Sequence, residues 1–263
     1  MNKPNETLRL VKHFTPVQAV GVDGVEKEEV QETLILTSEK ISAAGRTPEK
    51  IVVFIHGFNK FGAWENIHSG NRLVENGYMA ALPSQMGFGG SEGERDYCGP
   101  KTVRAIVDSV QMIANEHGLT SDDIVIWGVS RGAIITSLIA TKYPDLAAGY
   151  ICQAGAYDFL KNHNDPARPQ DMKENVIKET NGDVEGAARD RSAIFDVERI
   201  TKPLLVLHGD ADDMINVEQA YLFEAALKVA GKTYEMHIVP GGTHHISRQV
   251  SQIGLDFVKR TLK

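Results

Sequence analysis

The feature that most constrains this chain is an apolar run, Ile124–Trp127, that leads into the letters GVSRG at residues 128–132. Where a buried strand turns sharply into a helix at such a pattern, the central serine is held in a strained backbone and its hydroxyl is exposed at the end of the sheet. Small residues are needed at Gly128 and Gly132 because strand and helix pass very close around that turn. The stretch therefore predicts a nucleophile elbow at Ser130.

The rest of the chain alternates between short apolar runs and amphipathic segments. Continuous apolar runs such as Ile51–Ile55 are typical of parallel strands that are buried on both faces. We therefore predict an α/β fold with a mostly parallel twisted sheet and helices on both faces. The predicted strands are residues 30–37, 51–55, 78–82, 124–127, 150–153, 204–207 and 234–239, and the predicted helices are residues 63–75, 103–117, 131–143, 217–230 and 246–262.

Two segments depart from this alternation. Residues 1–28 are polar and mixed, and we interpret them as a lead-in of short strands, whereas residues 38–50 are predicted to form a loop. Residues 159–200 are charged and contain Pro166, Pro169 and Gly182, which predicts a small helical cap insertion between two strands. A chain of 263 residues is within range for a single α/β domain, so we expect one domain over residues 1–263.

A serine hydroxyl is a weak nucleophile and needs a base within hydrogen-bond reach. In parallel sheets the ligand site lies at the carboxyl ends of the strands, so the base should follow a strand. Of the nine histidines, His244 and His245 follow the last predicted strand in a glycine-containing loop. We favour His244 and keep His245 as the alternative.

The acid that orients the base should also follow a strand. Asp210 and Asp212 come directly after the apolar run at residues 204–207, and Asp158 follows the preceding strand. We favour Asp212 because it gives the chain order Ser, Asp, His that is found in α/β-hydrolase sites. Its carboxylate would fix the tautomer of the histidine and stabilise the imidazolium without taking up the proton. Asp158 and Asp210 are the alternatives.

The oxyanion that forms in acyl transfer needs hydrogen-bond donors. The backbone amides of Phe58, which follows the strand at 51–55, and of Arg131, which follows the serine, are the candidates. The Arg131 side chain is either a charge on the helix surface or a group that binds an acidic or carbonyl function of the substrate. Apolar residues of the insertion could line an acyl site, although helix packing is the simpler role for them; these are Met172, Ile177, Ile194 and Phe195.

Composition excludes several classes of function. A net charge of −7 disfavours nucleic acid as a partner, and no apolar run approaches the roughly 20 residues that span a bilayer. The polar start of the chain, Met1–Glu6, lacks a secretory signal, and the two cysteines, Cys98 and Cys152, make no disulfide framework. We expect a cytoplasmic protein with buried, reduced thiols that uses no cofactor and no metal.

Six stretches of the chain, quoted in order, resemble the α/β-hydrolase superfamily and, within it, catalytic domains of the prolyl-oligopeptidase type: IVVFIHGF, GFGGSEG, DYCGP, IVIWGVSRGA, ITKPLLVLHGDADDMINVEQA and VPGGTHHI. They span roughly residues 50–262. The resemblance implies that Ser130 is the nucleophile, Asp212 the acid and His244 the base, which are the residues that the spacing also indicates.

The sequence departs from the large peptidases of this family in two ways. It has no room for their propeller domain, and Phe58 stands in the loop where many of them carry a tyrosine whose hydroxyl serves the oxyanion. Small serine esterases are therefore the nearer match. We expect a serine hydrolase that cleaves a carboxylic ester of a small-molecule acyl substrate through an acyl-enzyme. The alternatives are a peptidase or amidase, and a non-catalytic binding protein of the same fold.

Overall fold

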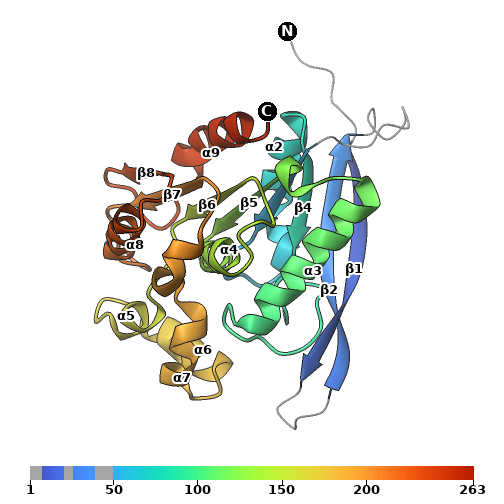
Figure 1. The fold of residues 1–263 in the computed structure, drawn as a ribbon. Coiled ribbons are helices and arrows are strands. Elements are labelled where there is room, and N and C mark those ends of the chain that lie inside the picture. The colour runs from blue at the N-terminus through green and yellow to red at the C-terminus, as the bar shows by residue number, and fades with distance from the viewer. Residues whose placement is uncertain (1–7, 21–25, 39–49) are drawn as a thin grey trace.

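The computed structural model describes residues 8–20, 26–38 and 50–263, and the strands in these ranges form one eight-stranded sheet (Figure 1). The strands are β1 (Leu8–Val20), β2 (Glu26–Ser38), β3 (Ile51–Ile55), β4 (Met79–Pro83), β5 (Ile124–Val129), β6 (Gly149–Gln153), β7 (Leu204–Gly209) and β8 (Tyr234–Val239). Their order across the sheet is β1-β2-β4-β3-β5-β6-β7-β8. The strands from β4 to β8 in this order are parallel, whereas β1 pairs antiparallel with β2, and β2 pairs antiparallel with β4.

Helices cover both faces of this sheet, as the sequence predicts (Figure 1). On one face lie α3 (Pro100–His117), α4 (Arg131–Lys142) and α8 (Glu218–Val229), and on the other lie α2 (Ile67–Glu75) and α9 (Ser247–Thr261). All five residues of β3 are buried: Val53 belongs to the core under α3 and α4, and Val52 to the core under α2 and α9. A strand buried on both faces needs apolar residues at every position, which explains the continuous run.

The segment between β6 and β7 is helical, as expected for the insertion. It contains α5 (Phe159–Asn164), α6 (Gln170–Glu179), α7 (Val184–Ala188) and the 3-10 segments η3 (Arg189–Arg191) and η4 (Ala193–Arg199). We call residues 159–200 the cap insertion. Its helices α5–α7 gather at one end of the molecule (Figure 1). Phe159 of α5, Val176 of α6 and Tyr97 form a small apolar cluster there.

The prediction of short strands in the N-terminal segment was wrong for the residues that the structure describes. β1 and β2 are 13 residues each and pair from Leu8 opposite Ser38 to Val20 opposite Glu26. β1 is an edge strand on which Leu10, Val11 and Phe14 are exposed, so its sequence lacks the alternation that marks a half-buried strand. Residues 1–7 and 21–25, and most of the loop predicted at 38–50, lie outside the described residues.

Candidate active site

The turn between β5 and α4 has the geometry of a nucleophile elbow. Ser130 adopts φ 55° and ψ −117°, a left-handed conformation that a side-chain-bearing residue rarely takes. A methyl group on Gly128 would overlap the carbonyl of Gly132, and one on Gly132 would overlap the carbonyl of Ile55. The two glycines are therefore required by close backbone approach, as the sequence indicated.

The loop after β8 brings His244 against Ser130. The His244 Nε2 lies 2.9 Å from the Ser130 Oγ, and the His244 Nδ1 lies 2.8 Å from Oδ2 of Asp212. Both contacts are within hydrogen-bond range, and all three side chains are buried or nearly so. Nδ1–H donates to the carboxylate in this arrangement, so Nε2 is the acceptor that faces the serine hydroxyl.

The carboxylate of Asp212 is fixed from both sides. Its Oδ1 accepts hydrogen bonds from the amides of Met214 (2.9 Å) and Ile215 (2.8 Å), and its Oδ2 also lies 3.2 Å from Nε2 of His208. Burial acts to raise the pKa of Asp212, but the hydrogen bonds from His208 and His244, the His244 charge and the Ile215 amide outweigh it and hold this pKa well below its usual value. Asp212 is thus ionised at neutral pH.

The other candidates from the sequence lie elsewhere. His245 is exposed and packs edge-to-face on the ring of His244, with centroids 5.6 Å apart. Asp210 accepts a hydrogen bond from an amide of the loop after β8, at 2.6 Å, and so shapes that turn. Asp158 is the N-cap of α5, where it accepts an amide hydrogen bond at 3.0 Å. The structure brings Asp212 and His244 to the serine, and none of these three alternatives.

The predicted oxyanion donors lie on either side of Ser130. Gly57 packs directly on the serine, because a methyl group built there would lie 3.1 Å from the Ser130 Cβ, and Phe58 follows it. No backbone hydrogen bond within residues 8–20, 26–38 and 50–263 engages the amide of Phe58 or of Arg131, which begins α4. Two free amides beside a serine hydroxyl are the donors that an oxyanion needs.

The loop that carries Phe58 is held by a buried histidine, His56, at the end of β3. The Nδ1 of His56 contacts the carbonyl of Gly57 at 2.6 Å, and its Nε2 accepts from the amide of Gln85 at 3.0 Å. Burial lowers the pKa of His56 to about 4, with a smaller contribution from nearby arginine charges. A neutral imidazole is the form that donates at Nδ1 and accepts at Nε2, so His56 fixes this loop.

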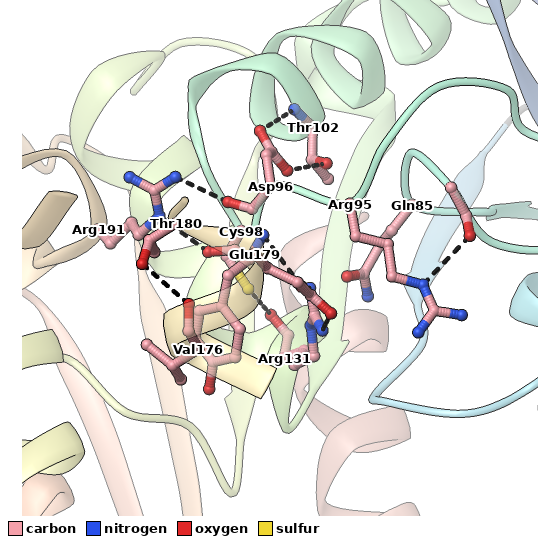
Figure 2. Close-up of polar contacts among 12 residues, drawn as sticks. Gln85, Arg95, Asp96, Cys98, Thr102, Arg131, Val176, Glu179, Thr180 and Arg191 are labelled. Carbon is pink, nitrogen blue, oxygen red and sulfur yellow. Dashed lines mark hydrogen bonds and ion pairs between the residues drawn. The ribbon is translucent and has the colours of Figure 1, made fainter. Parts of the chain in front are cut away.

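The Arg131 side chain is not a surface charge. It is buried, and its Nη2 and Nη1 lie 2.7 Å and 3.2 Å from the two carboxylate oxygens of Glu179 on α6 (Figure 2). The ion pair joins the helix that follows the serine to the cap insertion. Sequence analysis missed Glu179, since nothing in the spacing of residues 131 and 179 indicates that they meet.

A cavity of about 100 Å³ reaches the Ser130 side chain beneath the cap insertion. Of the four insertion residues weighed as an acyl lining, Met172 lines it, whereas Ile177 and Phe195 are exposed and Ile194 is half-buried away from the lining. The lining consists of Phe58, Tyr97, Ser130, Arg131, Ile134, Arg168, Asp171, Met172, Asn175, Met214 and Ile215.

The two cysteines are buried, as expected, and neither contacts Ser130. Burial raises the pKa of Cys98 to about 11 and raises that of Cys152 further, so both stay as thiols. Among the described residues, no three histidine, cysteine or carboxylate side chains are placed to hold a metal ion. In the same ranges, no helix is both long enough and apolar enough to cross a membrane.

The sheet order, the elbow and the serine–histidine–aspartate contacts define an α/β hydrolase. The model of the prolyl oligopeptidase family matches residues 71–263. With more than half of its residues matched, the chain belongs to that family of serine hydrolases.

Among the proteins that are similar to this chain, some are named peptidases and others esterases. An uncharacterized peptidase of Bacillus subtilis (strain 168), YtmA, is 25% identical over 189 residues, which cover 69% of this chain and 73% of the relative. The Pyrococcus horikoshii acylaminoacyl peptidase superposes with a TM-score of 0.75 at 19% identity, over 97% of this chain and 42% of that one. The Pyrococcus furiosus esterase Pf2001 superposes with a TM-score of 0.64 at 16% identity, over 94% of this chain and 90% of that one. The chain thus spans less than half of the acylaminoacyl peptidase.

Proposed function

We propose that Ser130, His244 and Asp212 form a catalytic triad that hydrolyses carboxylic esters of small acyl substrates through an acyl-enzyme. The observation that carries this proposal is the unbroken hydrogen-bonded chain from the Ser130 Oγ to the His244 ring, at 2.9 Å, and from the ring to the Asp212 carboxylate, at 2.8 Å. A nucleophile whose base is itself oriented by a third group is the general arrangement for activating a serine.

The chemistry runs in two halves. The His244 Nε2 takes the hydroxyl proton as the Ser130 Oγ attacks the ester carbonyl, and the amides of Phe58 and Arg131 donate hydrogen bonds to the oxyanion. The tetrahedral intermediate then collapses, and the alkoxide leaves with the proton held on His244. In the second half, water attacks the carbonyl of the acyl-enzyme while His244 takes a proton from that water. His244 then returns the proton to the Ser130 Oγ as the carboxylic acid product leaves. Asp212 stabilises the imidazolium in each half.

Two features of the site favour esters over amides. The cavity at Ser130 is about 100 Å³, well below the roughly 300–1,000 Å³ of pockets for drug-sized ligands, so it suits a compact substrate rather than a peptide. At the oxyanion position Phe58 offers only a backbone amide, with no side-chain hydroxyl to add a donor. Amide cleavage has the higher intrinsic barrier, so it depends more on such donors.

Peptide or amide cleavage is the second candidate, because the family and the Bacillus relative both carry a peptidase name. A panel of matched substrates separates the two. The purified protein is given short-chain p-nitrophenyl esters and the corresponding aminoacyl p-nitroanilides, with a fluorophosphonate probe to report the activated serine. Ester turnover well above anilide turnover supports the proposal, and the reverse order assigns a peptidase. Absence of both labelling and turnover indicates a non-catalytic binding protein.

A further inference from the structure

Three arginines are buried around Tyr97, and two of them have their charge compensated or fully hydrogen-bonded within the protein, although the Nε of Arg131 has no partner among the described residues. Arg131 pairs with the carboxylate of Glu179. Arg191 donates to the backbone carbonyl of Asp96 at 2.7 Å (Figure 2). It also donates to the carbonyl of Tyr97 at 3.0 Å and, at 3.2 Å, to a carbonyl in α7. Such partners offset the cost of removing a guanidinium from water.

The third arginine, Arg168, lacks such partners. Only 6% of its surface is exposed, and within residues 8–20, 26–38 and 50–263 the one hydrogen bond from its guanidinium runs from Nη2 to the Tyr97 hydroxyl, at 2.7 Å. Its Nε and Nη1 are shielded from water, and in these ranges they have no hydrogen-bond partner and no carboxylate lies within ion-pair distance of Arg168. A buried charge without a counter-ion is costly, which points to a partner that arrives from outside the chain.

Arg168 lines the same cavity as Ser130. Asp171 also borders this cavity, but it is exposed and makes no ion pair with Arg168. Burial and the charges of Arg168 and Lys173 lower the pKa of nearby His163, whose Nδ1 is likewise buried and has no partner in the part of the chain that the structure describes. An anionic group that enters the cavity would therefore meet an unpaired guanidinium close to the reacting serine.

We propose that Arg168 binds a free carboxylate of the substrate, so that the preferred substrates are compact esters that carry one carboxylate besides the ester group. The inference rests on the proposed esterase function and adds the chemical class of its substrate. The free donors of Arg168 would make charge-assisted hydrogen bonds to that carboxylate, which are stronger than hydrogen bonds between neutral groups. Tyr97 acts as a positioning residue, since its hydroxyl holds the guanidinium from the other side.

The test compares esters of matched shape that differ in charge. For the acyl side, the pair is monoethyl succinate and ethyl 4-methylpentanoate, followed by ethanol release. For the alcohol side, the pair is 4-carboxyphenyl acetate and 4-isopropylphenyl acetate, followed by phenol release. In the wild type we expect kcat/KM to favour the charged ester about tenfold or more in at least one pair, because a charge-assisted hydrogen bond is worth about that factor.

Variants then locate the preference. Arg168→Met should bring the charged-to-neutral ratio of kcat/KM to one or below, and Arg168→Lys should keep part of the preference. The control is Arg189→Met, which removes an exposed arginine of the cap insertion that pairs with Asp196 and should keep the wild-type ratio. Both esters of a pair are measured on one preparation, so the ratio does not depend on the fraction of folded protein.

Two results would overturn the carboxylate site: equal or poorer turnover of the charged ester in both wild-type pairs, or an unchanged preference in Arg168→Met. In both cases the fluorophosphonate probe still labels the protein and the neutral esters are still cleaved. Failure of the underlying esterase function has a different signature, with neither labelling nor release of product from any of the four esters.

Discussion

The loops at the carboxyl ends of the strands and the cap insertion above them hold their polar groups in different ways. At the strand ends, Asp212 and His56 are bound by backbone amides and carbonyls close by in the chain or on neighbouring strands. In the cap insertion, buried arginines bind groups from distant segments: Arg131 pairs with the carboxylate of Glu179, and Arg191 donates to backbone carbonyls of the segment before α3. Nearby main-chain groups thus contribute much of the first region's contacts, whereas charged side chains that join distant segments hold the second.

The difference suggests a division of labour. Strand ends anchored in a sheet whose central strands are buried can hold a nucleophile and its base to within the few tenths of an ångström that proton transfer requires. A cap insertion joined to the sheet by buried charges can vary its lining without disturbing those strands. Substitutions in the first region should therefore alter the chemical step, whereas substitutions in the second should alter stability and substrate preference.

The largest effect is expected from Asp212→Asn at the strand ends. The amide can still accept from the Met214 and Ile215 amides but can no longer orient His244 as a base, so kcat should fall about 10⁴-fold while the fold is kept. Steady-state ester hydrolysis measures kcat, and circular dichroism measures whether the fold is kept. Asp213→Asn, at an exposed neighbouring position, is the control and should behave as wild type. Normal turnover in Asp212→Asn would move the acid to Asp210 or Asp158.

Glu179→Gln tests the cap insertion in the same way. The substitution leaves Arg131 buried and uncompensated, so the free energy of unfolding should fall by about 3–5 kcal/mol, with a much smaller change in kcat than for Asp212→Asn. Urea unfolding measures the loss. Glu174→Gln on the exposed side of the same helix is the control. A drop in kcat as large as that of Asp212→Asn would contradict the proposal that the cap insertion affects stability rather than the chemical step.

Acid should weaken the strand-end region through His56. Its pKa is about 4 in the folded protein and about 6.5 when unfolded, so the unfolded state binds more protons between these values. Its stabilising effect is complete above pH 6.5 and is lost as the pH falls toward 4, by about 2–3 kcal/mol at pH 4.5. Urea unfolding at pH 7.5 and 4.5 should show this loss of stability in the wild type. The difference in stability between the two pH values should be smaller in His56→Gln. Equal pH dependence in both proteins would contradict the assignment.

The smallest effect is expected outside both regions. Asn216 precedes α8, and its Oδ1 accepts from the amide of Glu218 at 3.0 Å, as the predicted helix start requires. Asn216→Ala should lower the free energy of unfolding by about 1 kcal/mol and leave kcat/KM unchanged. The variant shows how large a stability loss a single surface hydrogen bond causes, and the losses in the other two regions are compared with it. A fall in kcat/KM in Asn216→Ala would contradict this prediction.

Much of the sheet and all three residues of the proposed triad can be predicted from the sequence, because each depends on local signals. Apolar runs mark the buried strands, and Ser130 and Asp212 each follow one of them, while His244 follows the half-buried last strand. β1 could not be predicted, since an edge strand with exposed apolar residues carries no alternation. Its length is set by pairing with β2, which is a tertiary contact.

The polar contacts of the cap insertion could not be predicted from the sequence either. Residues 97, 131, 168, 179 and 191 come from separate segments, and no periodic spacing relates them. Whether a buried arginine has a counter-ion depends on which side chains meet it in space. The role of the Arg131 side chain was open for that reason, and Arg168 carried no signal at all.

The most direct test of the account is to find which serine is activated. Wild-type protein and Ser130→Ala are treated with a fluorophosphonate probe, and peptide mass spectrometry locates the adduct while ester hydrolysis is measured in parallel. The account predicts a single adduct on Ser130, its absence from the variant, and a loss of hydrolysis by about 10⁴-fold or more in that variant. An adduct on another serine, or ester hydrolysis retained by Ser130→Ala, would contradict it.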